Sequence, residues 1–186
     1  QVNITNIKVL RADDDLDILK GVLQEALEQS EVVLLTGGIS VGDYDFVLQA
    51  VTQCGVTQLF HRIKQRPGKP LYFGKKNERL VFGLPGNPSS VLTCFYQFVI
   101  PALQLLSNTK NDLLTKQAPL GKAYRKAAGL THFLKGYYDG EKATPLDAQE
   151  SYRLSSFAKA NCLIQINEDI IEREEGENVE IHLLPA

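Results

Sequence analysis

The sequence predicts an α/β domain with a three-layer, mainly parallel sheet, followed by a small all-β domain. Up to about residue 106, apolar runs of strand length alternate with longer segments whose apolar residues recur at helical spacing. Two of the apolar runs end in glycine-rich loops. From about residue 121, short apolar runs are broken by glycine and charged residues, which is typical of short antiparallel strands.

The first part of the chain reads as strands and helices in alternation. Leu16, Leu19 and Leu23 begin one apolar helical stripe, and an aspartate in front of it could cap the helix. Pro101 removes a backbone donor from the longest apolar helix, so a kink or break is expected there. The expected elements, in order, are strand 4–10, helix 16–27, strand 32–35, helix 46–51, strand 56–64, hairpin 71–82 and helix 89–106.

The character of the sequence changes after Leu106. We expect residues 1–107 to form the α/β domain, the polar segment 108–120 to be a linker, and residues 121–186 to form the β domain. In the β domain the expected strands are 122–127, 132–138, 161–166 and 179–184, with a short helix or turn at 151–159.

Composition narrows the classes of function. The formal net charge of −2 over 186 residues argues against a general nucleic-acid binder. No apolar run approaches the roughly 20 residues of a membrane span, and no signal-peptide pattern opens the chain. Cys54, Cys94 and Cys162 lack metal-ligand spacing and are expected to pack as small hydrophobes, so the cytoplasm is the expected compartment. The sequence contains no methionine, which we interpret as the mark of a fragment.

Both glycine-rich loops predict binding of phosphate or another oxyanion. Each follows a strand and enters a helix, so backbone N–H groups are free to bind an anion. Two such loops in one domain suggest one ligand with phosphate at more than one place. The candidate binding residues are Thr36, Gly37, Gly38, Ser40, Gly42 and Asp43 in the first loop, and Pro85, Gly86, Asn87 and Ser89 in the second.

Two acidic clusters lie at ends of strands. Asp43 and Asp45 sit in the first glycine loop, where carboxylates next to phosphate could hold Mg²⁺. Both could equally be turn and cap residues, at about even odds. Asp13, Asp14 and Asp15 fall on the edge of the sheet where ligands bind, but helix capping explains them as well.

A basic segment, 61–70, lies between the glycine loops. Alternation would put Arg62, Lys64 and Arg66 on one face of a strand, with Lys69 following the Pro-Gly turn. Such a segment suits an anionic substrate, although lysines on an edge strand can also protect against aggregation. The absence of a Walker A lysine and of GxGxxG disfavours an ordinary ATP or NAD site.

The motifs, taken together and in this order, resemble the molybdopterin molybdenumtransferases (MoeA and gephyrin E-domain-like proteins). The matching segments are TGGISVGDYD at 36–45, RPGKP at 66–70 and GLPGNPS at 83–89. Residues 149–151, 155–157 and 160–164 resemble the family's small C-terminal β domain. The first loop alone would also fit the related molybdopterin adenylyltransferases.

The resemblance implies insertion of molybdate into adenylylated molybdopterin, with release of AMP in a Mg²⁺-dependent step. It implies catalytic roles for Asp45, Asp14, Arg62 and Arg66, with Mg²⁺ held by Asp45 and Asp14. Lys69 and Ser151 would join the glycine-loop residues in binding the cofactor precursor. The family implies a homodimer, with a molybdopterin adenylyltransferase as a possible partner.

The chain departs from the family pattern at its start. A first strand with a TGDEL-like motif and a helix after a DSN-like motif are missing from the MogA/MoaB-like α/β domain, so we expect the chain by itself to bind weakly or not at all. Two alternatives stay open. One is a molybdopterin adenylyltransferase, against which the β domain argues, and the other is a non-catalytic scaffold or binding module.

Overall fold

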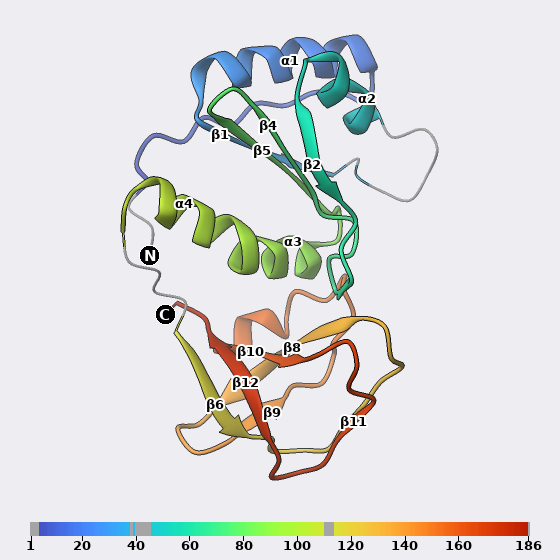
Figure 1. The fold of residues 1–186 in the computed structure, drawn as a ribbon, viewed down its shortest axis with the longest axis vertical. Helices are drawn as coiled ribbons and strands as arrows, with labels where there is room; N and C mark the ends of the chain where they lie inside the picture. Colours follow the sequence, from blue (N-terminus) through green and yellow to red (C-terminus); the bar gives the residue numbers. More distant parts are fainter. Residues whose placement is uncertain (1–3, 38, 40–45, 110–113, 186) are drawn as a thin grey trace. The chain divides into compact units, whose positions relative to one another are not determined.

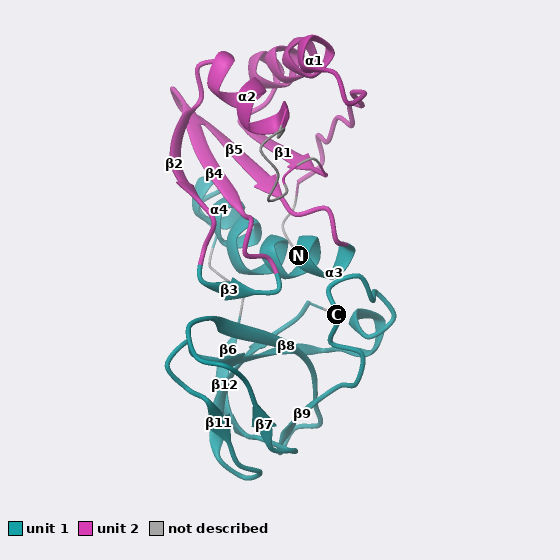
Figure 2. Ribbon diagram, turned by 90° about the vertical axis from the view of Figure 1, so that its right-hand side faces the viewer, with its two compact units in different colours: residues 1–2, 64–67, 88–186 teal, residues 3–63, 68–87 magenta. Residues whose placement is uncertain are grey.

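The structure is a computed structural model that describes residues 4–37, 39, 46–109 and 114–185 (Figure 1). By their contacts, the residues divide into two compact units (Figure 2). Residues 3–63 and 68–87 form one, called here the α/β unit. Residues 1–2, 64–67 and 88–186 form the other, called the β unit. The helical segment after Asn87 therefore groups with the β unit.

The α/β unit contains a four-stranded sheet in the order β1-β5-β4-β2. β1 and β5 pair in parallel, β5 and β4 pair antiparallel, and so do β4 and β2. Three strands thus run in one direction and only β4 runs against them, so the predicted α/β class is confirmed and the sheet is mixed. The strands are β1 (Val32–Thr36), β2 (Thr57–His61), β4 (Tyr72–Lys76) and β5 (Arg79–Leu84).

Two helices, α1 (Leu16–Gln29) and α2 (Phe46–Gln53), share one apolar core with this sheet. Leu23 of α1 and Val51 of α2 are each 1% exposed, and Val81 of β5 is fully buried. α1 begins where the sequence predicts, because the carboxylate of Asp15 accepts hydrogen bonds from the backbone N–H of Asp17 and Ile18, each at 3.0 Å.

The predicted strand at 4–10 is wrong, because this segment forms no strand. Ile7 is 72% exposed and Val9 80% exposed. The segment is held instead by Lys8, whose ammonium contacts Glu25 at 2.6 Å and Gln29 at 2.8 Å on α1. An apolar alternation becomes a strand only beside a hydrogen-bonding partner. In the described part of the chain, β1 pairs with β5 alone and leaves its other edge open.

The hairpin predicted at 71–82 is confirmed as β4 and β5, with Asn77 in the left-handed region at a φ of 52°. The strand predicted at 56–64 is shorter than expected. β2 ends at His61 because Arg62 adopts a φ of 66°, which no strand residue has.

The β unit begins with a continuous helical run made of α3 (Pro88–Cys94), the π-helix η1 (Phe95–Val99) and α4 (Ile100–Leu106). The π-helical turn lies directly before Pro101, where a donor is missing, so the predicted break takes the form of changed hydrogen bonding. Over residues 88–106 the run has the length and hydropathy of a membrane span. Leu92 and Tyr96 of this run pack on a buried cluster of the β unit.

The rest of the β unit is a six-stranded sheet in the order β3-β8-β10-β12-β6, with β9 beside β8. The predicted all-β character is confirmed. Residues 115–119, predicted as linker, form β6, because their backbone pairs with β12. The strands are β3 (Gln65–Arg66), β6 (Thr115–Pro119), β8 (Thr131–Tyr138), β9 (Ala143–Pro145), β10 (Cys162–Ile166) and β12 (Asn178–Leu183). A separate pair joins β7 (Tyr124–Arg125) to β11 (Glu172–Arg173), and the 3₁₀ helix η2 is Phe157–Lys159.

Candidate functional site

Three of the predicted motifs leave the same edge of the α/β sheet. β1, β5 and β2 run in one direction, so the loops after Thr36, Leu84 and His61 all start at carboxyl ends of strands. Thr36 and Leu84 are direct partners in the register of β1 and β5. This is the edge at which ligands bind in open α/β sheets.

The two glycine loops approach each other closely. A Cβ atom on Gly86 would lie 3.9 Å from the Cα atom of Gly37. Gly37 has a φ of 81°, a conformation in which a side chain would be strained. Ile39 is 3% exposed and its side chain occupies the space that a Cβ on Gly83 would need. The described start of the first loop is therefore anchored on the end of β5, beneath the second loop.

Much of the first loop lies outside the described residues. This applies to the predicted binding residues Gly38, Ser40, Gly42 and Asp43 and to the predicted catalytic Asp45. In the second loop, Pro85 is buried while Gly86 and Asn87 are exposed. The backbone at the tip of the second loop is thus accessible to a ligand.

The basic segment does not form one continuous strand, because a tight turn follows β2. The N–H of Arg62 donates to the carbonyl of Leu71 at 3.0 Å, and the N–H of Ile63 donates to that of Lys69 at 2.9 Å. Gly68, with a φ of 98°, makes the turn between them. Arg62 and Lys69 are both exposed on this loop, so two cations are displayed at the edge that carries the glycine loops.

The expectation that Arg62, Lys64 and Arg66 share one strand face is wrong. The left-handed backbone at Arg62 ends β2, and Arg66 lies on β3 in the β unit, paired with β8 opposite His132. The Nδ1 atom of His132 and the hydroxyl of Tyr124 form a hydrogen bond of 2.9 Å. Burial, together with the nearby charges of Lys126 and Arg66, lowers the pKa of His132 to about 4, so this histidine is neutral.

Ser89 and Ser151, predicted from opposite ends of the sequence, are joined by a hydrogen bond in the β unit. The N–H of Ser89 donates to the carbonyl oxygen of Ser151 at 3.0 Å. Ser89 is fully buried, and its Oγ has no hydrogen-bond partner among the described residues. A buried hydroxyl without a partner has an unmet hydrogen-bonding capacity.

The acidic cluster before α1 divides into separate roles. Asp15 is the helix N-cap, and the carbonyl of Asp13 accepts a hydrogen bond from the N–H of Asp15 at 2.7 Å. Asp14 is exposed. Within the ranges that the structure describes, no three histidine, cysteine or acidic side chains gather to hold a metal ion. The described residues alone do not form a magnesium site.

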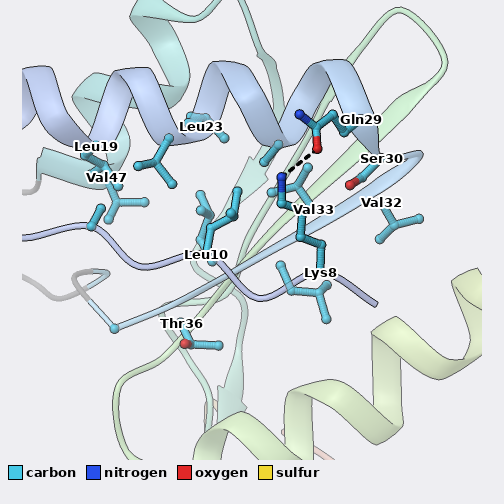
Figure 3. Close-up of a pocket in the computed structure, with 16 residues that line it drawn as sticks. Lys8, Leu10, Leu19, Leu23, Gln29, Ser30, Val32, Val33, Thr36 and Val47 are labelled. Carbon is cyan, nitrogen blue, oxygen red and sulfur yellow. Dashed lines mark hydrogen bonds between the residues drawn. The ribbon is translucent and has the colours of Figure 1, made fainter. Parts of the chain in front are cut away.

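One cavity of about 210 Å³ lies between the N-terminal segment, α1 and β1 (Figure 3). Leu10, Leu23 and Val33 contribute apolar side chains to its walls, and Lys8 and Gln29 contribute polar ones. Of the predicted binding residues, Thr36 and Gly37 line it. The cavity follows the open edge of β1 and reaches the carboxyl end of that strand at Thr36 and Gly37.

The cysteines behave as predicted. All three are buried thiols that form no disulfide with one another. Burial raises the pKa of Cys94 and of Cys162 to about 12, so these thiols stay protonated.

The structure defines a protein of the α/β class with glycine loops and exposed cations at the carboxyl edge of its sheet, joined to a mostly antiparallel β unit. Comparison with known families makes the class specific. Residues 2–105 match the family described as probable molybdopterin binding domain, and residues 117–184 match the MoeA C-terminal region, domain IV. The chain belongs to the molybdopterin molybdenumtransferase (MoeA) family.

Individual relatives agree with this assignment. The chain is 30% identical to a molybdopterin molybdenumtransferase of Bacillus subtilis over 99% of its length, and 33% identical to that of Haemophilus influenzae over 94%. A solved molybdopterin biosynthesis MoeA protein from Pyrococcus horikoshii superposes with a TM-score of 0.73 at 30% identity, covering 92% of this chain and 40% of the other. The chain spans 44% and 46% of the two curated relatives.

Proposed function

We propose that the full-length product of this gene is a cytoplasmic molybdopterin molybdenumtransferase. It inserts molybdenum from molybdate into the dithiolene of molybdopterin in a Mg²⁺-dependent reaction, in which water hydrolyses the phosphoanhydride of the adenylylated precursor and AMP leaves. The observation that carries the proposal is the meeting of the three motif loops at one edge of the α/β sheet. The relatives that bear this name support the reaction class.

The ligand's charges match the groups displayed at that edge. Backbone N–H groups of the two glycine loops would bind the phosphates of adenylylated molybdopterin. The exposed cations Arg62 and Lys69 would balance the remaining negative charge and attract molybdate. Asp45 and Asp14 are proposed to hold Mg²⁺, since hard cations bind carboxylate oxygens and bridge to phosphate.

Three further proposed site residues lie in the β unit. Ser89 has a buried hydroxyl without a hydrogen-bond partner among the described residues, and Ser151 is joined to it through the backbone. Arg66 is an exposed cation on β3. Each of the three is proposed to take part in the binding or reaction of molybdopterin in the full-length enzyme.

We further propose that the 186-residue chain by itself binds molybdopterin weakly or not at all. The curated relatives are more than twice as long as their match to this chain. Among the described residues, one edge of the parallel strand β1 has no partner strand, and a cavity lies beside it. Tight binding of molybdopterin or its adenylate by the isolated chain, measured by isothermal titration, would overturn this part.

Two partners are proposed from the family resemblance. The enzyme would act as a homodimer, which sedimentation of the full-length product would reveal as twice the monomer mass. A molybdopterin adenylyltransferase would supply the adenylylated substrate, since that substrate needs prior transfer of an adenylyl group.

The proposal is tested by reconstitution of nitrate reductase with the full-length gene product. Wild type is expected to restore activity, and Asp45→Ala to lose at least about 100-fold, because a group that acts in the chemical step typically contributes 10²–10⁴-fold. Asp17→Ala is the matched control, since Asp17 is an exposed first-turn carboxylate on α1 outside the predicted site. Removal of Mg²⁺ with EDTA should abolish the wild-type activity, and addition of Mg²⁺ should restore it.

Unchanged reconstitution by Asp45→Ala would remove the catalytic assignment. Failure of wild type to reconstitute would favour the scaffold or binding module instead. The match of residues 117–184 to the MoeA C-terminal region disfavours the adenylyltransferase alternative.

A further inference from the structure

A buried ammonium lies at the centre of the β unit. Lys135, in the middle of β8, is 2% exposed. Its Nζ donates to the carbonyl oxygens of Ala148 at 2.8 Å, Glu150 at 3.3 Å and Arg153 at 3.2 Å. An ammonium has three donors, and three acceptors satisfy it. Because leaving any of them unpaired in a buried site costs free energy, this geometry is strongly specified.

All three acceptors belong to one loop, residues 146–156, called here the serine loop because it contains Ser151. No carboxylate within the described residues forms an ion pair with Lys135. Burial lowers the pKa of Lys135, and the nearby charge of Glu150 opposes that effect. The positive charge is therefore neutralised mainly by backbone dipoles, and the loop must keep its shape for the carbonyls to converge.

The backbone of Lys135 is bound to the same loop through Gln149. The Gln149 Oε1 accepts from the Lys135 N–H at 3.0 Å, and the Gln149 Nε2 donates to the Lys135 carbonyl at 2.8 Å. The same Nε2 donates to the Leu146 carbonyl at 2.6 Å. The Gln149 amide thus satisfies the backbone N–H and carbonyl of Lys135, as a neighbouring strand would. The serine loop therefore binds both the backbone and the side chain of Lys135.

The serine loop is joined in turn to the start of α3. Ser151 accepts the hydrogen bond from the Ser89 N–H. Phe157, directly after the loop, stacks on Tyr96 with ring centroids 6.4 Å apart. The Nζ of Lys135 lies 5.9 Å from the centroid of the Phe157 ring. Displacing the ammonium would therefore disturb both contacts between the loop and the helical run.

A second buried lysine shows that burial alone does not give this arrangement. Lys126 is 7% exposed, and its Nζ donates to the carbonyls of Leu130 at 2.9 Å and Glu168 at 3.3 Å. Those carbonyls belong to two separate segments, neither of which carries a predicted binding residue. Lys126 stabilises the fold, whereas the partners of Lys135 converge on the one loop that contains Ser151.

We propose that Lys135, together with Gln149, is a positioning residue that holds the serine loop in the shape in which Ser151 meets the ligand. The inference rests on the proposed function, because it takes Ser151 to be a molybdopterin-binding residue. Lys135 itself does not touch the ligand in this proposal, since its three donors are already bound to carbonyls.

The test compares Lys135→Met, Lys135→Arg and the control Lys126→Met in the full-length gene product. Amide hydrogen exchange of residues 147–156 reports the loop without any ligand, and titration reports the Kd for molybdopterin. We expect Lys135→Met to accelerate exchange in the loop by about tenfold and to raise the Kd by about tenfold. Lys135→Arg keeps the donors and should restore the Kd to within about threefold of wild type. Lys126→Met should lower the melting temperature without either effect.

The outcomes distinguish failure of the positioning role of Lys135 from failure of the proposed molybdopterin binding. Unchanged exchange in the serine loop of Lys135→Met would overturn the positioning role. Faster exchange with an unchanged Kd would make Lys135 a purely structural residue and also overturn it. If wild type does not bind molybdopterin, the proposed function fails, while the exchange measurement still decides whether Lys135 holds the loop.

Discussion

The sheets of the two units differ in how their strands find partners. In the β unit, β10 is paired on both sides, and Cys162, Leu163 and Ile164 are fully buried. Among the described residues of the α/β unit, β1 is paired on one side only, and Leu34 is 39% exposed. Antiparallel strands reach their neighbours through short turns, whereas parallel strands need crossovers from distant sequence. A short chain can therefore complete the first kind of sheet more easily than the second.

The largest effect should come from emptying the centre of the complete sheet. Ile164→Ala is expected to destabilise the β unit by about 3 kcal/mol, because it removes a fully buried side chain from a packed core. Leu34→Ala, the matched change on β1, should cost less than about 1 kcal/mol, because that side chain is already partly in water. Hydrogen exchange resolved by unit measures both. Equal losses of stability in Ile164→Ala and Leu34→Ala would contradict the difference between the two sheets.

Acidification should lower the free energy of unfolding of the β unit by an amount comparable to that of Ile164→Ala. The folded-state pKa of His132, about 4, lies below the usual 6.5, so the unfolded chain binds the proton more readily between these values. The stability that His132 contributes is therefore complete above pH 6.5 and is lost as the pH falls towards 4, by up to about 3 kcal/mol.

His132→Gln should flatten this pH dependence, as measured by denaturation of the variant and wild type at pH 7, 5.5 and 4. The matched control is His182→Gln, a histidine on β12 in the same sheet whose nitrogen contacts Glu180 at 2.9 Å. That control should keep the wild-type slope attributed to His132. A His132→Gln slope identical to wild type would contradict the assignment.

The same difference explains which parts of the fold were predictable. Helix α1 and the β4–β5 hairpin follow from local signals, namely a capping aspartate with helical spacing and a polar turn between apolar runs. The 4–10 segment has the pattern of a strand but lies beside no pairing partner, which no local pattern reveals. β6 was hidden in a polar segment because an edge strand needs few apolar residues.

The candidate site was predictable where glycine or turn chemistry marks it, and hidden where burial decides. The sequence led directly to the glycine loops, and the structure brings Gly37 and Gly86 together. The role of Lys135 was not predictable from the sequence, because lysine side chains are mostly exposed to solvent. The one sequence signal near it was Gln149, which belongs to the segment 149–151 that resembles the family's C-terminal β domain. Only the fold shows the carbonyls converging on a buried ammonium.

The smallest expected effects concern the acidic cluster before α1, where a structural aspartate and a proposed metal ligand are neighbours in the α/β unit. Asp15→Ala should destabilise α1 by about 1 kcal/mol, because two backbone donors lose their acceptor. Asp14→Ala should leave stability unchanged within about 0.5 kcal/mol, since this side chain is exposed, yet it should lower nitrate reductase reconstitution if Asp14 holds Mg²⁺. Asp13→Ala, one residue away and also exposed, is the control for register. Loss of activity in Asp13→Ala with full activity in Asp14→Ala would move the metal assignment by one residue, and the capping role of Asp15 would stand.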